Sequence, residues 1–152
     1  MATDIRIEMP SSFASQLQKL GNTVAKYVAT EVRDQLTDEY RSSVERFYAS
    51  YSPEYYERTW QLKNSSKPYY KNPHGTRYHG GVEITDEGMA DTHHQSNSVI
   101  LNNALRGIHG KPSIYTPPEI GEHMMKFQEM IYNNIESIGD GAIAKAKAEC
   151  GF

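Results

Sequence analysis

The side chains that could carry chemistry gather in the middle of the chain. Five of the six histidines fall in or beside this polar stretch, namely His74, His79, His93, His94 and His109. Acidic residues lie close to the adjacent pair of histidines, at Asp86, Glu87 and Asp91. Carboxylates and imidazoles together can bind a divalent metal that activates water. One hypothesis is therefore a metal-dependent nuclease or hydrolase that uses Asp86, Asp91, His93 and His94.

The spacing of these residues argues against a metal site. A zinc site needs three or four ligands that converge at about 2.0–2.3 Å. No two histidines are four residues apart, as on one face of a helix, and the neighbours His93 and His94 would diverge in a strand. The single cysteine, Cys150, lies in the last three residues. We therefore expect no metal and no cofactor, and we interpret the histidines as polar loop residues.

Motifs of nucleophilic and phosphate chemistry are missing from the sequence. There is no Gly-x-Ser-x-Gly elbow and no phosphate loop that ends in Gly-Lys-Ser/Thr. His79-Gly80-Gly81 resembles part of an oxyanion loop, but no serine elbow accompanies it. We predict instead that Gly75, Gly80 and Gly81 serve tight turns. The expectation is a protein without catalytic residues, which is not an enzyme.

The composition favours an assembling domain over a nucleic-acid binder or a membrane protein. The length of 152 residues fits one domain spanning 1–152. The net charge of −3 comes without a basic tract, which argues against sequence-independent binding of nucleic acid as the main role. No run approaches the ~18 apolar residues of a membrane span. Eleven tyrosines against four phenylalanines favour surfaces that a partner later covers.

A long helix is predicted in the first third of the chain. Residues 1–10 are expected to form an N-terminal arm, and Ser11 or Ser12 can cap the helix that follows Pro10. Apolar residues then recur every three or four positions from Phe13 to Phe47, which predicts a helix of roughly 50 Å. A helix this long does not fit inside a domain with a radius of gyration near ~15 Å. It is therefore either broken, for example at Gly21, or part of it projects and meets a partner.

The rest of the chain predicts a small sheet and C-terminal helices. Arg58, Trp60 and Leu62 alternate with polar residues, which predicts a strand running to Lys63. The further predicted segments are a turn at 64–66, a strand at 69–70, a loop at 72–81, a strand at 81–85 and a helix at 99–108. A last helix is predicted to start after Thr116-Pro117-Pro118-Glu119 and to be interrupted at Gly139 and Gly141. Residues 142–152 are expected to form a C-terminal tail that is helical over 142–149. The predicted fold class is α+β, with a long N-terminal helix, a small antiparallel sheet and a C-terminal helix.

An aromatic segment behind the long helix is the strongest candidate for an interface. Tyrosine, tryptophan and arginine are the residue types enriched at binding hot spots. The segment supplies six candidate interface residues, which are Tyr51, Tyr55, Tyr56, Arg58, Trp60 and Leu62. The alternative is that the segment packs on the chain's own long helix. Both interpretations stay open.

Two segments resemble a known family. The first is Tyr-Ser-Pro-x-Tyr-Tyr-x-Arg-Thr-x-x-Leu at 51–62, and the second is Leu-Arg-Gly-Ile-His-Gly at 105–110, which adds His109 to the candidate interface. Together with the order of elements over residues 11–140, they resemble the small neck or tail-completion proteins of tailed bacteriophages, particularly of phages that infect Gram-positive hosts. These proteins sit among the components that join head and tail.

The resemblance implies a structural virion protein that is made in the host bacterial cytoplasm. It implies assembly into a ring between the head connector and the tail, without catalysis. The implied partners are copies of the chain itself, adjacent head-connector and tail proteins, and double-stranded DNA that passes through the lumen without sequence-specific binding; no membrane is implied. The alternatives are a tail terminator or another minor capsid or tail component, and the metal-dependent nuclease or hydrolase described above.

Overall fold

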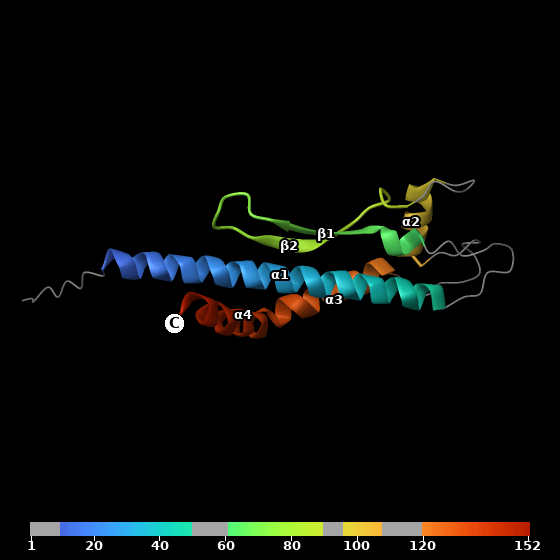
Figure 1. Cartoon of the computed structure of the whole chain (residues 1–152). Coiled ribbons are helices and arrows are strands. Elements are labelled where there is room, and N and C mark those ends of the chain that lie inside the picture. Colours follow the sequence, from blue (N-terminus) through green and yellow to red (C-terminus); the bar gives the residue numbers. More distant parts are fainter. Residues whose placement is uncertain (1–9, 50–60, 90–95, 108–119) are drawn as a thin grey trace, which may run out of the picture.

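One helix runs the length of the molecule and the other elements pack along it. The computed structural model describes residues 10–49, 61–89, 96–107 and 120–152. Helix α1 (Ser11–Ala49) carries an antiparallel hairpin of β1 (Ser66–Lys71) and β2 (His79–Ile84) on one side. Helices α3 (Ile120–Asn133) and α4 (Ile135–Cys150) lie on the other side, as Figure 1 shows. This arrangement confirms the predicted α+β fold with a long N-terminal helix and a small antiparallel sheet.

Helix α1 is continuous over 39 residues. It does not break at Gly21, where an added Cβ would meet nothing within 4 Å. One side of its C-terminal half is buried, whereas residues 11–19 are all exposed, including Phe13 at 41% and Leu17 at 40%. The expectation of a break was wrong, and the expected projection is confirmed, while contact with a partner stays a prediction. Its first turns project beyond the described residues that pack on it, and they leave apolar side chains uncovered by those residues.

The hairpin approaches α1 so closely that glycine is required at one position. An added Cβ at Gly80 would overlap the carbonyl oxygen of Ala29 in the middle of α1. Residues on the same face as Gly80, such as Val82 and Ile84, therefore pack toward the helix, and the alternate positions point away. The prediction of a tight turn was wrong for Gly80 and Gly81, which lie within β2, since the strand already begins at His79.

The predicted strand ending at Lys63 was wrong where the structure describes it. Residues Gln61–Asn64 form a 3₁₀ helix, η1. Neighbouring residues in a strand point to opposite faces, but Gln61 and Leu62 are both buried, and a helical turn lets both reach the core. The backbone N–H of Leu62 also donates to the Tyr48 hydroxyl at 3.3 Å. Residues 58–60 of the predicted strand lie outside the described residues.

The core is built between the C-terminal half of α1 and the elements around it. Its buried members are Tyr40, Val44, Phe47, Tyr48, Leu62, Met89, Leu101, Ala104, Ile120 and Met124. The Tyr40 hydroxyl lies 2.5 Å from Ser65 Oγ, which itself donates to the Leu62 carbonyl at 2.6 Å. Because Ser65 has only one hydroxyl proton, Tyr40 must be the donor to Ser65. Burial raises the pKa of Tyr40, which keeps this donor protonated.

The short helix α2 (Asn97–Leu105) closes one end of the core. It starts two residues before the predicted position and ends before Gly107, whose positive φ of 68° stops the helix. The Asn97 side-chain amide donates to the Met89 carbonyl at 3.0 Å, which ties the start of α2 to the segment that follows β2. Leu101 and Ala104 then face the core.

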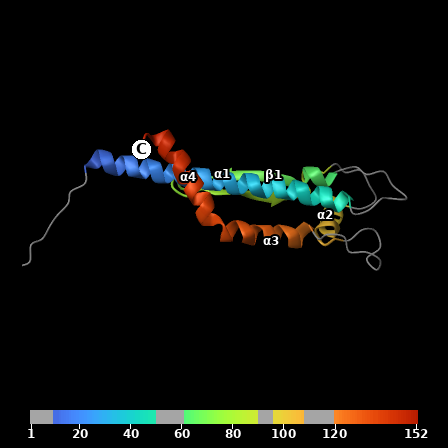
Figure 2. The same ribbon diagram turned by 90° about the horizontal axis from the view of Figure 1, so that it is seen from below.

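The C-terminal helices meet at a bend that differs from the prediction. The interruption lies at Asn134, whereas Gly139 and Gly141 are inside α4. The Asn134 side-chain amide donates to the Met130 carbonyl at 3.0 Å. The side chain thus satisfies a backbone carbonyl near the end of α3. The chain turns there, and α4 crosses α1 on the face opposite the hairpin, as Figure 2 shows. The helix predicted over 142–149 is confirmed as the last part of α4, which ends at Cys150.

Candidate assembly surfaces

The residues named for metal chemistry are mostly outside the described part of the chain. Asp91, His93, His94 and His109 fall there, while Asp86 and Glu87 are described. Glu87 forms an exposed ion pair with Lys67 at 3.5 Å. Within residues 10–49, 61–89, 96–107 and 120–152, no three metal-ligating side chains come together. The hypothesis of a metal centre at His93 and His94 therefore stays a prediction.

Of the candidate interface residues, the structure describes only Leu62. Its side chain is 3% exposed and packs in the core against α1, so it serves internal packing and offers no surface to a partner. The remaining candidates, Tyr51, Tyr55, Tyr56, Arg58, Trp60 and His109, lie outside the described residues.

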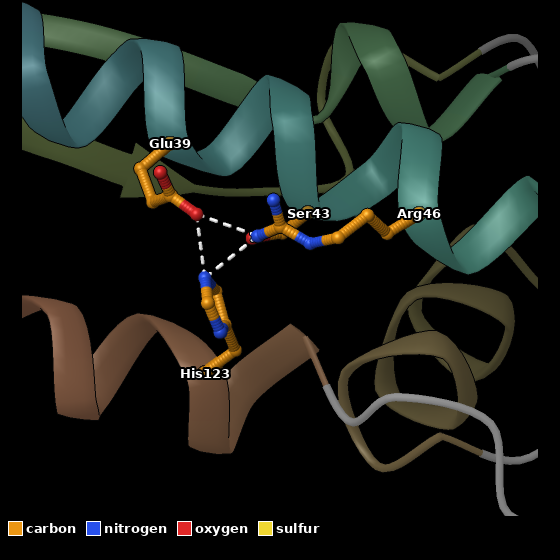
Figure 3. Close-up of polar contacts among 4 residues, drawn as sticks. All are labelled: Glu39, Ser43, Arg46 and His123. Atoms are coloured by element: carbon orange, nitrogen blue, oxygen red, sulfur yellow. Dashed lines mark hydrogen bonds and ion pairs between the residues drawn. The ribbon is translucent and has the colours of Figure 1, made fainter.

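A polar cluster that the sequence did not indicate connects α1 to α3. Figure 3 shows that the Glu39 carboxylate accepts hydrogen bonds from Arg46 Nη2 and from His123 Nε2, both at 2.5 Å. Arg46 also donates to Ser43 Oγ at 3.0 Å. Glu39, Ser43 and Arg46 are spaced four and three residues apart, which places them on one face of α1. His123 comes from the first turns of α3 and faces them.

The cluster is arranged for docking two helices and not for nucleophilic chemistry. Ser43 is 3% exposed, and its partner in the cluster is Arg46. His123 Nε2 lies 2.5 Å from the Glu39 carboxylate and 2.6 Å from Arg46 Nη2, so this ring nitrogen is engaged by both side chains of α1. Burial alone would raise the pKa of Glu39, but its hydrogen bonds to Arg46 and His123 and their charges lower it on balance. Glu39 is therefore an ionised acceptor held between two donors.

Within this cluster, only the spacing of the three α1 residues could have been recognised from the sequence. The residues at 39, 43 and 46 lie within a segment that the periodicity already predicted as helix. Their partner His123 is 84 residues away from Glu39, and nothing in the sequence pairs the two.

The outward side of the hairpin carries Lys67, Tyr69 and Lys71 on β1, and Glu83 of β2 stands opposite Lys67 on the same side. These residues alternate with the positions that pack toward α1, so they point away from the helix. Lys71 Nζ lies 5.2 Å from the centre of the Tyr69 ring. Glu87, which follows β2, also lies 3.5 Å from Lys67 Nζ. The outward side of the hairpin thus presents charges of both signs around an aromatic ring.

The outward side of the C-terminal helices forms an acidic face, which we define as Met125, Glu129, Tyr132, Glu136 and Asp140. All five are exposed, with Met125 at 62% and Tyr132 at 76%. The three carboxylates of this face form no ion pair with another described residue. Residues 120–141 contain four carboxylates against the single cation Lys126. The acidic face therefore presents uncompensated charge around two large apolar side chains.

Comparisons with other proteins leave the family of this chain undetermined. The chain was compared with protein-family models, with curated proteins and with solved structures, and no match was found. The resemblance to phage neck proteins therefore stays a prediction. No helix among the described residues combines the length and the apolar character that crossing a membrane requires.

Proposed function

We propose that this protein is a structural subunit of a phage neck that assembles into a ring joining the head connector to the tail. The observation that carries the proposal is the pair of different surfaces on opposite sides of α1, the hairpin on one side and α3 and α4 on the other. A ring subunit needs two different surfaces. This chain offers such a pair.

The order of elements also supports the proposal. The resemblance of residues 51–62 and 105–110 implies an α+β domain with a long first helix and a small antiparallel sheet, and the fold has these elements. The proposed partners are further copies of the chain, the adjacent connector and tail proteins, and duplex DNA in the lumen. A tail terminator or another minor capsid or tail component would share these features and would differ in its position within the particle.

A metal-dependent nuclease or hydrolase receives no comparable support. Of the four residues named for it, only Asp86 lies among the described residues. The side chains of the polar cluster at Glu39 and His123 contact one another and join α1 to α3. No specific observation favours catalysis by this chain.

Deleting the gene for this chain from a phage that encodes it tests the proposed function. Loss of a neck subunit is expected to give filled heads and finished tails that do not join, and wild-type protein supplied in trans should restore whole particles. Electron microscopy of the lysate distinguishes these outcomes. Complete, infectious particles that lack the chain would overturn the proposal.

A further inference from the structure

We infer that the tip of the hairpin and the first half of α1 form one surface that contacts the phosphate backbone of duplex DNA. This inference rests on the proposed function, because it assigns a surface of the subunit to the DNA that passes through the proposed ring. We call this surface the basic end and define it by four cations, which are Lys19 and Lys26 on α1 and Lys71 and Arg77 at the hairpin tip.

The fold brings these four cations to one region of the molecule. The tip of the hairpin lies beside the first half of α1, as Figure 1 shows. A hollow of about 350 Å³ is lined by Lys19 and Lys26 of α1 and by Tyr78, which follows Arg77 at the tip. Lys71 is the last residue of β1 and so stands at the same tip.

The positive charge of the basic end is not balanced by its own segments. Residues 11–30 contain two lysines and no acidic residue, and residues 68–82 contain one lysine, one arginine and no acidic residue. All four cations are exposed, and none forms an ion pair with another described residue. Among the described residues that line the hollow, only Glu149 is acidic, and its carboxylate accepts a hydrogen bond from the Tyr27 hydroxyl at 2.6 Å. The basic end is therefore locally positive although the whole chain has a net charge of −3.

The base of the hairpin differs from its tip in charge balance. Lys67 stands opposite Glu83, and its Nζ lies 3.5 Å from the Glu87 carboxylate. Lys71 is four residues further along β1, about 13 Å away in strand geometry. The carboxylates at the base therefore balance Lys67 and leave Lys71 uncompensated, so only the tip of the hairpin belongs to the basic end.

The side chains between the two lysines of α1 suit a phosphate backbone. Ser15, Gln18 and Asn22 line the hollow together with Lys19 and Lys26. Hydroxyl and amide side chains donate to phosphate oxygens in protein–DNA complexes, and lysine and arginine supply the charge. Lys19, Asn22 and Lys26 recur every three or four residues, so they share one side of the helix. Contacts of this kind carry no sequence information, which fits DNA that moves past the surface.

Duplex DNA fits the basic end better than a protein partner does. A protein interface has apolar residues at its centre. Apart from Tyr78, the described residues that line the hollow are polar or charged. Leu17 is exposed on α1, but its separation from Lys19 by two positions places it on nearly the opposite side of the helix. The basic end thus offers charge and hydrogen-bond donors without an apolar centre.

Binding of duplex DNA by the purified full chain tests the inference. Fluorescence anisotropy measures the affinity for a labelled duplex as the salt concentration rises. If each of the four cations contacts one phosphate, the affinity should fall about 150-fold between about 50 mM and about 200 mM salt. Duplexes of unrelated sequence should bind equally well, because the contacts are made to the backbone.

Two double variants each remove half of the charge of the basic end. They are Lys19→Gln/Lys26→Gln and Lys71→Gln/Arg77→Gln. Each should weaken binding at the lowest salt at least ~10-fold and should reduce the loss over the same salt range to about 12-fold. The four residues are exposed, so the melting temperature by circular dichroism should stay close to that of the wild type. Should a double variant unfold, Lys26→Gln and Arg77→Gln repeat the titration with one cation removed each.

A matched control removes the same charge from two balanced lysines. Lys63 and Lys67 are paired with Glu45 at 3.1 Å and Glu87 at 3.5 Å. The variant Lys63→Gln/Lys67→Gln should therefore bind the duplex within about 3-fold of wild type and keep its salt dependence.

The contrary outcomes are distinct. Wild-type protein that does not bind the duplex at the lowest salt would overturn the inference, and the proposed function stands if the chain is present in particles. An equal loss in the test variants and the control would also overturn it, since total charge would then explain the binding. Binding to vesicles of anionic lipid that needs the same cations, without binding to the duplex, would assign the basic end to lipid headgroups. Absence of the chain from particles would overturn the proposed function itself.

Discussion

The carboxylate of Glu39 holds α3 to α1 at the scale of single residues. It is 20% exposed and accepts hydrogen bonds from two side chains, Arg46 and His123. We predict that Glu39→Gln lowers the free energy of unfolding by about 1–3 kcal/mol, the usual size for charged hydrogen bonds in part-buried sites. Urea unfolding measures this loss. The exposed neighbour Asp38 provides the control, and Asp38→Asn should change stability by less than about 0.5 kcal/mol.

The same carboxylate should make stability depend on pH in the acid range. Hydrogen bonds and the charges of Arg46 and His123 lower the pKa of Glu39 in the folded protein, although burial opposes them. The unfolded chain therefore takes up the proton at a higher pH than the folded chain. The stabilisation is complete above the unfolded pKa, about 4.3, and is lost as the pH falls through the folded pKa.

A titration of stability compares the wild type with Glu39→Gln. Urea unfolding from pH 6 down to pH 3 should show a steeper loss for wild type, so that the two proteins converge at the acid end. Parallel curves would show that the pKa of Glu39 is the same in the folded and unfolded states.

Gly80 is the residue at which the hairpin meets the long helix. We predict that Gly80→Ala destabilises the protein by about 1–3 kcal/mol or more, because the added methyl would overlap the rigid backbone of Ala29. The matched control is Gly139→Ala in α4, where an added Cβ meets open space and should stabilise by up to about 1 kcal/mol. Thermal unfolding followed by calorimetry compares the two. Equal effects at both sites would contradict the close approach of β2 to α1.

At the scale of elements, the sequence predicted α1 well and the C-terminal helices less well. Apolar residues recur regularly over the long segment from Phe13 to Phe47, and this period was sufficient to predict a helix. The stripe from Ile120 continues with equal regularity through Ile135, yet the helix bends at Asn134. Ile135 is 38% exposed after the bend. The bend brings α4 across α1, and a pattern along the chain does not contain that tertiary contact.

The sequence was also insufficient to predict the short element around Leu62. Alternation over a few residues predicted a strand, whereas burial of two neighbours requires a helical turn. Because Leu62 packs in the core, we predict that Leu62→Ala costs about 2–5 kcal/mol of stability, measured by urea unfolding. A variant with unchanged stability and weakened assembly would instead return Leu62 to the interface.

At the scale of the whole molecule, no stretch of sequence reveals which side chains share a surface. Lys67 and Lys71 share the outward side of the hairpin with Glu83, because Gly80 fixes which side packs on α1. The Glu129 carboxylate of α3 is exposed, because Met124 and Ile131 turn the opposite side of that helix inward. The candidate assembly surfaces are thus products of the fold, while the aromatic segment 51–62 supplied the hypothesis of a virion role.

Cryo-electron microscopy of purified particles from a phage that encodes this chain tests its role as a neck subunit most directly. We predict a ring at the junction of head and tail in which each subunit shows a long helix, with the hairpin on one side of it and α3 and α4 on the other. Complete particles whose junction contains no such subunit, together with absence of the chain in their mass spectrum, would contradict the proposed role.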